Sequence, residues 1–257
     1  KSFSCMKVVR KGEGEPEFTV MGSIHGDEPA GKKAIEEFLA EEREFRRPVQ
    51  FVIANEKALN EGERFLESDL NRSFPGDQDS EFYEERLAAE ITEVVKDTKL
   101  LDVHTTHSYP LPFATCSSLE DDIVDMIESA GVKNAVYFPG DDGTVTEYTE
   151  GMVVETGFQG TRQAVENAKG VIKNFLILQG AVEGEARRSN PQIFEVTDTV
   201  DGDWEFLAEN FKKVEKGQIY AVKGEEELEA KETFYPVLMS TNGYDGTLGY
   251  QARRKEI

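Results

Sequence analysis

The chain has 257 residues and a formal net charge of −22, with 51 acidic and 29 basic side chains. Its length supports one large domain with a buried core, or such a domain with a smaller appendage. So acidic a surface repels nucleic-acid phosphates and anionic membranes, and we expect neither as a partner. It also stays soluble where salt screens charge, which is consistent with a halophilic source although lysine is not scarce.

The sequence shows no sign of membrane insertion or export. No apolar run approaches the roughly 18 residues that cross a bilayer. The N-terminal segment KSFSCMKVVRKGEGEPEF lacks the apolar stretch of a signal peptide. We therefore expect a soluble, cytoplasmic protein.

Short apolar runs alternate with segments of helical periodicity through the first two thirds of the chain. In chain order, the sequence predicts strands at 18–24, 50–55, 100–106, 113–118, 135–140 and 152–157, and helices at 29–42, 80–97, 121–131 and 160–180. A long polar loop follows the second strand. Because the strands are apolar throughout rather than alternating, they are typical of strands covered on both faces. The predicted fold class is therefore α/β, with a mixed, mostly parallel central sheet flanked by helices.

The pattern changes after about Gly184. Strand-like segments at 193–202, 214–222 and 233–241 are separated by glycine and charged residues, and no further helix is expected among them. We interpret residues 1–182 as one α/β domain and residues 183–257 as a smaller β-rich C-terminal domain.

Two of the three histidines in the chain follow predicted strands directly. His25 and Glu28 lie in the turn GSIHGDEPAG, and His104 ends the strand LLDVHTT. Ligands of such folds gather at the carboxyl ends of the strands. Two histidines and one glutamate are typical of a catalytic zinc, which keeps a fourth position for water. The sequence therefore predicts one zinc ion per chain, bound by these three side chains, and metal-assisted hydrolysis.

Alternative interpretations of these histidines remain open. Taken singly, each is as typical of a turn residue that is hydrogen-bonded to the backbone. His107 is a rival third ligand, although it lies beyond the end of the strand. Asp102 lies two residues before His104, on the same face of the strand, and is expected to orient that histidine.

With these residues identified, the chain resembles the succinylglutamate desuccinylase and aspartoacylase family of the zinc carboxypeptidase superfamily. The resemblance runs from about Phe18 to Gly160 and more weakly to the end. The zinc motifs of the family match GSIHGDEPAG and DVH, an arginine followed by DLNR matches RFLESDLNRSFPG, and the segment around its catalytic glutamate matches MVVETG. The resemblance implies a zinc carboxypeptidase-like fold whose β-rich C-terminal domain caps the active site.

The resemblance also implies roles for individual side chains. Glu155 falls on the catalytic glutamate, and its apolar strand would raise its basicity. Arg64 would stabilise the oxyanion, unless it is a loop arginine paired with Glu61 or Glu67. Asn71 and Arg72 would bind the α-carboxylate of the substrate. Tyr244, in YPVLMSTNGYDG, would help to bind that carboxylate.

One departure from the family bears on the substrate. Aspartoacylase-like members bind the second carboxylate of an acidic substrate with a basic residue upstream of the catalytic glutamate. The corresponding stretch here, VYFPGDDGTVTEYTEGMVV, contains no lysine or arginine. The nearest, Arg162, follows Glu155 and is typical of a surface residue in a first helical turn. A substrate with a neutral or cationic side chain, such as an acetylated diamino acid, is therefore at least as consistent as a dicarboxylic one.

The leading function hypothesis is a zinc-dependent hydrolase that removes an N-acyl group from a small N-acyl amino acid. One alternative is a zinc carboxypeptidase, which would need an open cleft for peptides. The other is a non-catalytic zinc-binding protein of the same fold. A nitrogen and oxygen ligand set does not select zinc by affinity alone, so another divalent ion is also compatible. The sequence leaves open whether the chain forms a homo-oligomer.

Overall fold

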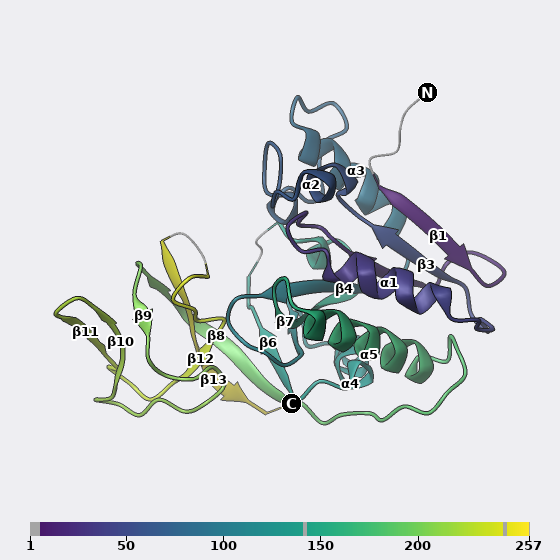
Figure 1. Ribbon diagram of the computed structural model, residues 1–257. Helices are drawn as coiled ribbons and strands as arrows, with labels where there is room; N and C mark the ends of the chain where they lie inside the picture. Colours follow the sequence, from purple (N-terminus) through teal and green to yellow (C-terminus); the bar gives the residue numbers. More distant parts are fainter. Residues whose placement is uncertain (1–5, 141–142, 244–245, 257) are drawn as a thin grey trace.

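The structure is a computed structural model that describes residues 6–140, 143–243 and 246–256 (Figure 1). Within these residues, ten strands form one sheet in the order β1-β3-β2-β4-β7-β5-β6-β8-β13-β12. The strands of this sheet are β1 (Lys7–Lys11), β2 (Phe18–Gly22), β3 (Val49–Ile53), β4 (Lys99–Thr106), β5 (Phe113–Cys116), β6 (Asn134–Tyr137), β7 (Gly151–Phe158), β8 (Gln192–Asp201), β12 (Tyr235–Val237) and β13 (Thr247–Lys255). The helices are α1 (Ala30–Ala40), α2 (Glu56–Glu61), α3 (Tyr83–Val95), α4 (Asp121–Ala130) and α5 (Arg162–Leu178), with short 3₁₀ helices η1 (Leu70–Arg72) and η2 (Val145–Glu147).

The pairing of the strands confirms the predicted mixed, mostly parallel sheet. Strands β3, β2, β4 and β7 are parallel neighbours, and so are β5, β6 and β8, whereas the pairs β1–β3, β5–β7, β8–β13 and β12–β13 are antiparallel. Strands β2, β4 and β7 lie next to one another in the middle of the sheet. Their carboxyl ends therefore meet at one edge, where side chains from distant parts of the chain can converge.

Helices cover both faces of the sheet, which explains the apolar strands. Helices α1, α4 and α5 cover one face, and α1 and α5 lie side by side on it (Figure 1). Helix α3 covers the other face. Because side chains alternate along a strand, Val20 packs in one core cluster with Phe38 of α1, while Met21 packs in the other with Leu87 of α3.

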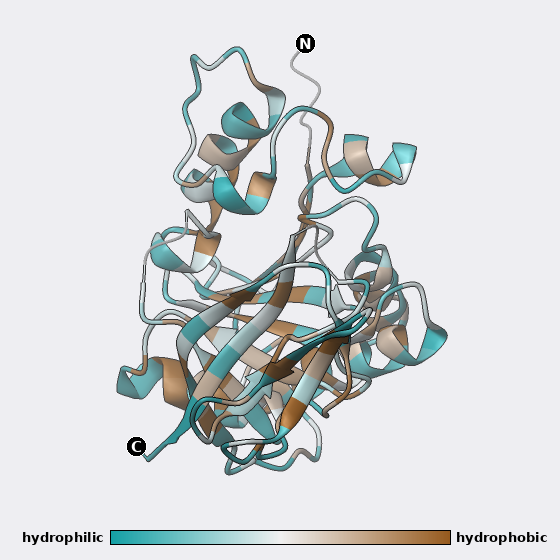
Figure 2. Ribbon diagram, turned by 90° about the vertical axis from the view of Figure 1, so that its left-hand side faces the viewer, coloured by the Kyte–Doolittle hydropathy of each residue, from teal (hydrophilic) through white to brown (hydrophobic). Residues whose placement is uncertain are grey.

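The C-terminal region extends the central sheet. Strand β8 pairs in parallel with β6, and β13 and β12 follow it, so the sheet crosses the predicted domain boundary between residues 182 and 183. A second sheet is formed by β9 (Glu205–Phe206), β10 (Ile219–Lys223) and β11 (Glu226–Glu229). In Figure 2 the C-terminal strands lie toward the viewer and mix hydrophilic with hydrophobic residues along their length. The division into two domains stays an interpretation of the sequence.

The predicted long polar loop contains a short helix, α2. The side chain of Asn55 accepts a hydrogen bond of 3.2 Å from the Ala58 N–H and so caps its first turn. Gly62 ends the helix with a φ of 71°, a left-handed conformation that favours glycine. This loop is therefore well structured beside the carboxyl end of β2. Among the described residues, no helix combines the length and the apolar character needed to cross a membrane.

Candidate active site

The turn between β2 and α1 carries two of the three predicted ligands. Within it, the backbone N–H of Glu28 donates to the carbonyl of His25 at 3.2 Å, which turns both side chains toward the same edge of the sheet. A Cβ atom on Gly26 would lie only 2.1 Å from the carbonyl carbon of Ala58. The glycine is therefore needed because α2 packs closely against the turn, rather than for a special backbone angle.

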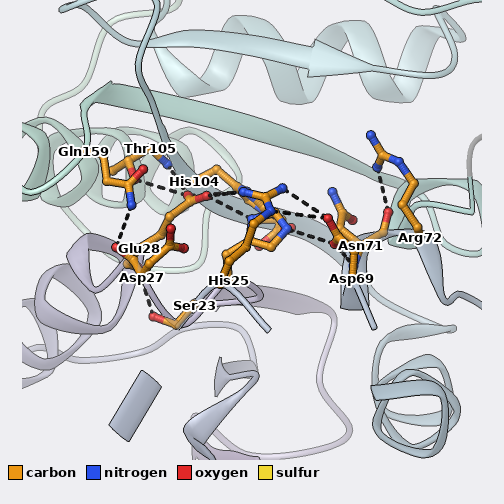
Figure 3. Close-up of polar contacts among 12 residues, drawn as sticks. Ser23, His25, Asp27, Glu28, Asp69, Asn71, Arg72, His104, Thr105 and Gln159 are labelled. Atoms are coloured by element: carbon orange, nitrogen blue, oxygen red, sulfur yellow. Dashed lines mark hydrogen bonds and ion pairs between the residues drawn. The ribbon is translucent and has the colours of Figure 1, made fainter. Parts of the chain in front are cut away.

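The structure brings the three predicted ligands together. His25, Glu28 and His104 are buried, and one donor atom from each lies within 4.8 Å of the others. The Nδ1 atom of His25 lies 2.9 Å from Oε1 of Glu28, and Nδ1 of His104 lies 3.6 Å from Oε2 of the same carboxylate. Figure 3 shows His25 between Glu28 and Asp69. These side chains could hold one metal ion.

Each histidine also contacts a carboxylate through its other ring nitrogen. Nε2 of His104 lies 2.9 Å from Asp102, as expected from the spacing in the strand. Nε2 of His25 lies 3.1 Å from Asp69, which sequence analysis missed although it belongs to the DLNR segment. An Nε2–H that donates to an aspartate leaves the lone pair of Nδ1 directed at the cluster. Both histidines are therefore held as metal ligands usually are.

The electrostatics of the cluster fit a divalent cation. Burial opposes the ionisation of Glu28, but the charges of His104 and His25 and the N–H of Thr105, at 2.7 Å, lower its pKa to about 2. Burial also opposes a charge on His104, but Asp102 and Glu28 outweigh it and raise its pKa to about 10. The surroundings thus favour positive charge at this place. Two nitrogens and a carboxylate oxygen are the donor set of a catalytic zinc.

Glu155 lies beside the cluster on β7, in register with His104 on β4. It is buried, and its Oε2 atom has no hydrogen-bond partner within the described residues. Burial, reinforced by the charges of Glu28 and Asp102, raises the pKa of Glu155 to about 8. This shift has the direction expected from its apolar strand. A carboxyl group of this kind can both accept and donate a proton near neutral pH.

Arg64 enters the site from the loop that follows α2. Its Nε and Nη2 atoms each donate to Asp69 at 3.3 Å, and its Nη1 atom lies 3.6 Å from Glu28. Its ion-pair partners within the described part of the chain are therefore Glu28 and Asp69, and not Glu61 or Glu67, which were the alternatives considered from the sequence. The guanidinium is partly exposed, which leaves it accessible to a ligand.

Asn71 and Arg72 follow on η1. The backbone N–H of Asn71 donates to Asp69 at 2.9 Å, and its side-chain Oδ1 is buried without a hydrogen-bond partner among the described residues. The guanidinium of Arg72 is exposed and donates to the carbonyl of Asn71 at 2.7 Å. Both side chains line the same pocket as the histidines.

One pocket of about 350 Å³ collects these side chains. Its wall includes Leu238, Thr247 and Tyr250 of the C-terminal region. Its lining includes His25, Glu28, Arg64, Asp69, Asn71, Arg72, His104, Phe138, Thr144, Glu147, Glu155, Leu238, Thr247 and Tyr250.

The remaining candidates lie elsewhere. His107 is exposed and does not belong to the metal-binding group found among the described residues. Arg162 is a surface residue in the first turn of α5, where it pairs with Glu37 and Glu166. Tyr244 lies outside the described residues.

Glu84 of α3 is a supporting residue that sequence analysis missed. Its fully buried carboxylate accepts hydrogen bonds from three successive backbone N–H groups, those of residues 66, 67 and 68, at 2.7, 3.0 and 3.2 Å. It thereby fixes the loop between Arg64 and Asp69. The sequence contains a signal, because Glu84 shares the apolar stripe of its helix with Leu87 and Ile91 at spacings of three and seven.

We expect Glu84→Gln to destabilise the fold by about 2–3 kcal/mol. The amide nitrogen of the glutamine cannot accept a hydrogen bond, so it would leave backbone N–H groups without the acceptor that the carboxylate provides. Urea unfolding measures the change in the free energy of unfolding. Glu93→Gln, at an exposed position of the same helix, is the control and should cost less than about 0.5 kcal/mol. Equal stability of the two variants would show that the loop does not depend on this carboxylate.

Comparisons with known proteins agree with the geometry. A family model described as the succinylglutamate desuccinylase/aspartoacylase catalytic domain matches residues 15–161. A succinylglutamate desuccinylase/aspartoacylase structure from Rhodobacter sphaeroides superposes with a TM-score of 0.78 at 22% identity, covering 97% of this chain and 89% of the other. The product-bound ectoine utilization protein EutE (DoeB) from Ruegeria pomeroyi gives 0.76 at 22% identity, with coverages of 96% and 87%. An aspartoacylase family protein from Mesorhizobium loti gives 0.74 at 20% identity, with coverages of 98% and 89%. A search of curated protein sequences found no match.

Proposed function

Because this chain belongs to the succinylglutamate desuccinylase/aspartoacylase family, we propose that it is a zinc-dependent hydrolase that removes the N-acyl group from a small N-acyl amino acid. The observation that carries the proposal is the placement of a metal-binding cluster, a carboxyl group of raised pKa and two arginines around one pocket. The expected partner is this small-molecule substrate, since the charge of −22 disfavours binding to nucleic acid and to anionic membranes.

The cluster and Glu155 would divide the hydrolytic chemistry between them. A zinc ion held by His25, Glu28 and His104 would make water nucleophilic at neutral pH and polarise the scissile carbonyl. Glu155 takes the proton of the attacking water and delivers it to the leaving amine. In the protein without the ion, burial raises the pKa of Glu155 to about 8, which makes this carboxylate a stronger base than an exposed glutamate.

The arginines would bind and stabilise the acyl amino acid. Arg64, next to Glu28, is placed to stabilise the charge that develops on the carbonyl oxygen, and Asp69 holds its guanidinium in position. Arg72 can bind the α-carboxylate with its two-pronged guanidinium, and Asn71 can contribute its buried side chain. The α-carboxylate anchor would position the amide next to the cluster.

The pocket favours a small substrate over a peptide. A volume of about 350 Å³ is near the lower end of the roughly 300–1,000 Å³ found for small-molecule sites. Leu238, Thr247 and Tyr250 of the C-terminal region contribute to its wall. A carboxypeptidase would need room for the peptide chain that precedes the scissile bond.

A substrate panel tests the proposal. Zinc-loaded protein is assayed at low and high salt with N-acetyl amino acids and with N-blocked dipeptides, and release of the free amino acid is measured. We expect kcat/KM for the best N-acetyl amino acid to exceed that for any dipeptide by at least about 100-fold, since the larger acyl part of the dipeptide is excluded from the pocket. Faster cleavage of dipeptides would favour the carboxypeptidase alternative. Stoichiometric zinc binding with no hydrolysis of either class would favour the non-catalytic one.

A further inference from the structure

Glu147, at the end of η2, adds a negative charge to the pocket wall that the proposed reaction does not use. The other acids of the described lining have roles in the cluster or beside it. Glu28 is a candidate ligand, Asp69 contacts His25 and Arg64, and Glu155 carries the proton. Glu147 therefore needs a separate explanation.

The carboxylate of Glu147 is held at the end of the pocket where Arg72 lies. Its Oε2 accepts a hydrogen bond from the Gly143 N–H at 3.0 Å, and its Oε1 accepts one from the Thr144 hydroxyl at 3.4 Å. Gly143 packs on the η1 segment, because its carbonyl accepts from the Phe74 N–H at 3.2 Å. A Cβ atom on Gly143 would lie 2.9 Å from the carbonyl oxygen of Arg72. The acid is thus fixed to the segment that would bind the α-carboxylate.

The balance of charges at this end of the pocket disfavours a second carboxylate on the substrate. Among the described lining residues, the lysine and arginine side chains are Arg64 and Arg72 alone. The proposed function assigns Arg64 to the carbonyl oxygen and Arg72 to the α-carboxylate. A side-chain carboxylate would meet Glu147 with no third guanidinium or ammonium group in that lining, and like charges would repel.

The same pocket suits a cation. Phe138 and Tyr250 both line it, and their rings pack edge to face with centroids 5.1 Å apart. Aromatic faces attract ammonium groups, particularly where water is partly excluded. A carboxylate and two aromatic rings in the lining of one pocket are therefore a chemically suitable environment for an alkylammonium group.

We propose that Glu147 binds the charged side-chain amine of the substrate, so that the preferred substrates are Nα-acyl derivatives of diamino acids. This inference rests on the proposed deacylase function and assigns its specificity. The α-carboxylate on Arg72 and the ammonium on Glu147 would orient the substrate between two opposite charges. A neutral side chain would lose one of these contacts, and an acidic one would replace it by repulsion.

Three substrates whose side chains each contain three carbon atoms test the assignment in the zinc-loaded protein: Nα-acetylornithine, N-acetylnorvaline and N-acetylglutamate. We expect kcat/KM for the ornithine derivative to exceed that for the norvaline derivative by about 10- to 100-fold, which is the value of a hydrogen bond to a charged group. The glutamate derivative should be the poorest. Glu147→Gln keeps an oxygen for the Gly143 N–H but removes the charge, so it should reduce the preference for ornithine over norvaline to about threefold or less, through a lower kcat/KM for the ornithine derivative.

Glu150→Gln is the matched control, since Glu150 lies three residues away, pairs with Lys99 at the surface and is not a lining residue of the pocket. It should keep the full preference. An equal loss for all three substrates in Glu147→Gln, or a wild-type preference for norvaline or glutamate, would overturn the assignment. If zinc-loaded protein hydrolyses none of them, the proposed function fails. Calorimetric binding of free ornithine, norvaline and glutamate to the same variants then decides separately whether Glu147 recognises the amine.

Discussion

Replacing His104 with alanine is expected to abolish tight zinc binding and, with it, hydrolysis of every N-acyl amino acid. The variant loses one of three candidate ligands and leaves Asp102 and Glu28 buried with less compensating charge. Changes to outer partners of metal sites typically cost 10- to 100-fold in affinity, so loss of a ligand should cost more than about 100-fold. Competition with a chelating indicator measures the zinc affinity, and mass spectrometry measures the metal content.

The matched control for this variant is His107→Ala. His107 is exposed and lies three residues further along the chain, outside the cluster. It should bind zinc and hydrolyse substrate like the wild type. Asp102→Asn should lie between the two, with an affinity lowered by about 10- to 100-fold. Wild-type zinc affinity in His104→Ala would show that the three side chains do not share an ion.

Glu155→Gln should retain zinc but lose about 10²- to 10⁴-fold in kcat, because the amide cannot accept the proton of the attacking water. The KM value should change little, since Arg64, Asn71 and Arg72 remain to bind the substrate. Steady-state kinetics of the zinc-loaded variant measure both constants, and metal analysis confirms that the ion is present. A variant that keeps more than about a tenth of the wild-type kcat would remove Glu155 as the proton carrier.

The raised pKa of Glu155 predicts a second effect of Glu155→Gln, on the pH dependence of stability. The pKa lies at about 8 in the folded protein against an ordinary value of 4.5, so folding favours the protonated form. This contribution to stability is fully present below about pH 4.5 and is lost as the pH rises through 8. In zinc-free protein, Glu155→Gln should therefore match the wild type at pH 4.5 and exceed its stability by on the order of 2–4 kcal/mol at pH 9. Urea unfolding at both pH values tests this, and a constant difference between the proteins would contradict the shift.

The elements that could be predicted from sequence are those whose signal is local. The buried strands of the sheet are continuous apolar runs, and the helices that cover them have a clear helical period, so the α/β class was predicted and is confirmed. Strand β1 was missed because its residues, KVVRK, are largely exposed and form an edge of the sheet without an apolar run. Helix α2 was missed because its six residues are mostly polar and its caps are short-range signals within a loop.

Strand order is a different kind of information. The pairing of β8 with β6, and of β13 and β12 beyond it, joins the C-terminal region to the central sheet. The residues of a segment determine its propensity to form a strand, but the strand with which it pairs depends on the packing of the whole fold. For that reason the C-terminal region looked separate in the sequence although part of it continues the same sheet.

For the candidate site too, sequence and tertiary structure supplied different information. The spacing of the histidines and Glu28 after predicted strands pointed to a metal site, and the resemblance to a known family implied roles for Glu155 and the arginines. Only the tertiary structure decided how they are held and what charge they meet: Asp69 against His25, Glu84 beneath the Arg64 loop, and Glu147 in the pocket wall. These roles depend on distances between segments that lie far apart in the chain. Burial and neighbouring charges then set the pKa of each group, and neither quantity exists before the strands have paired.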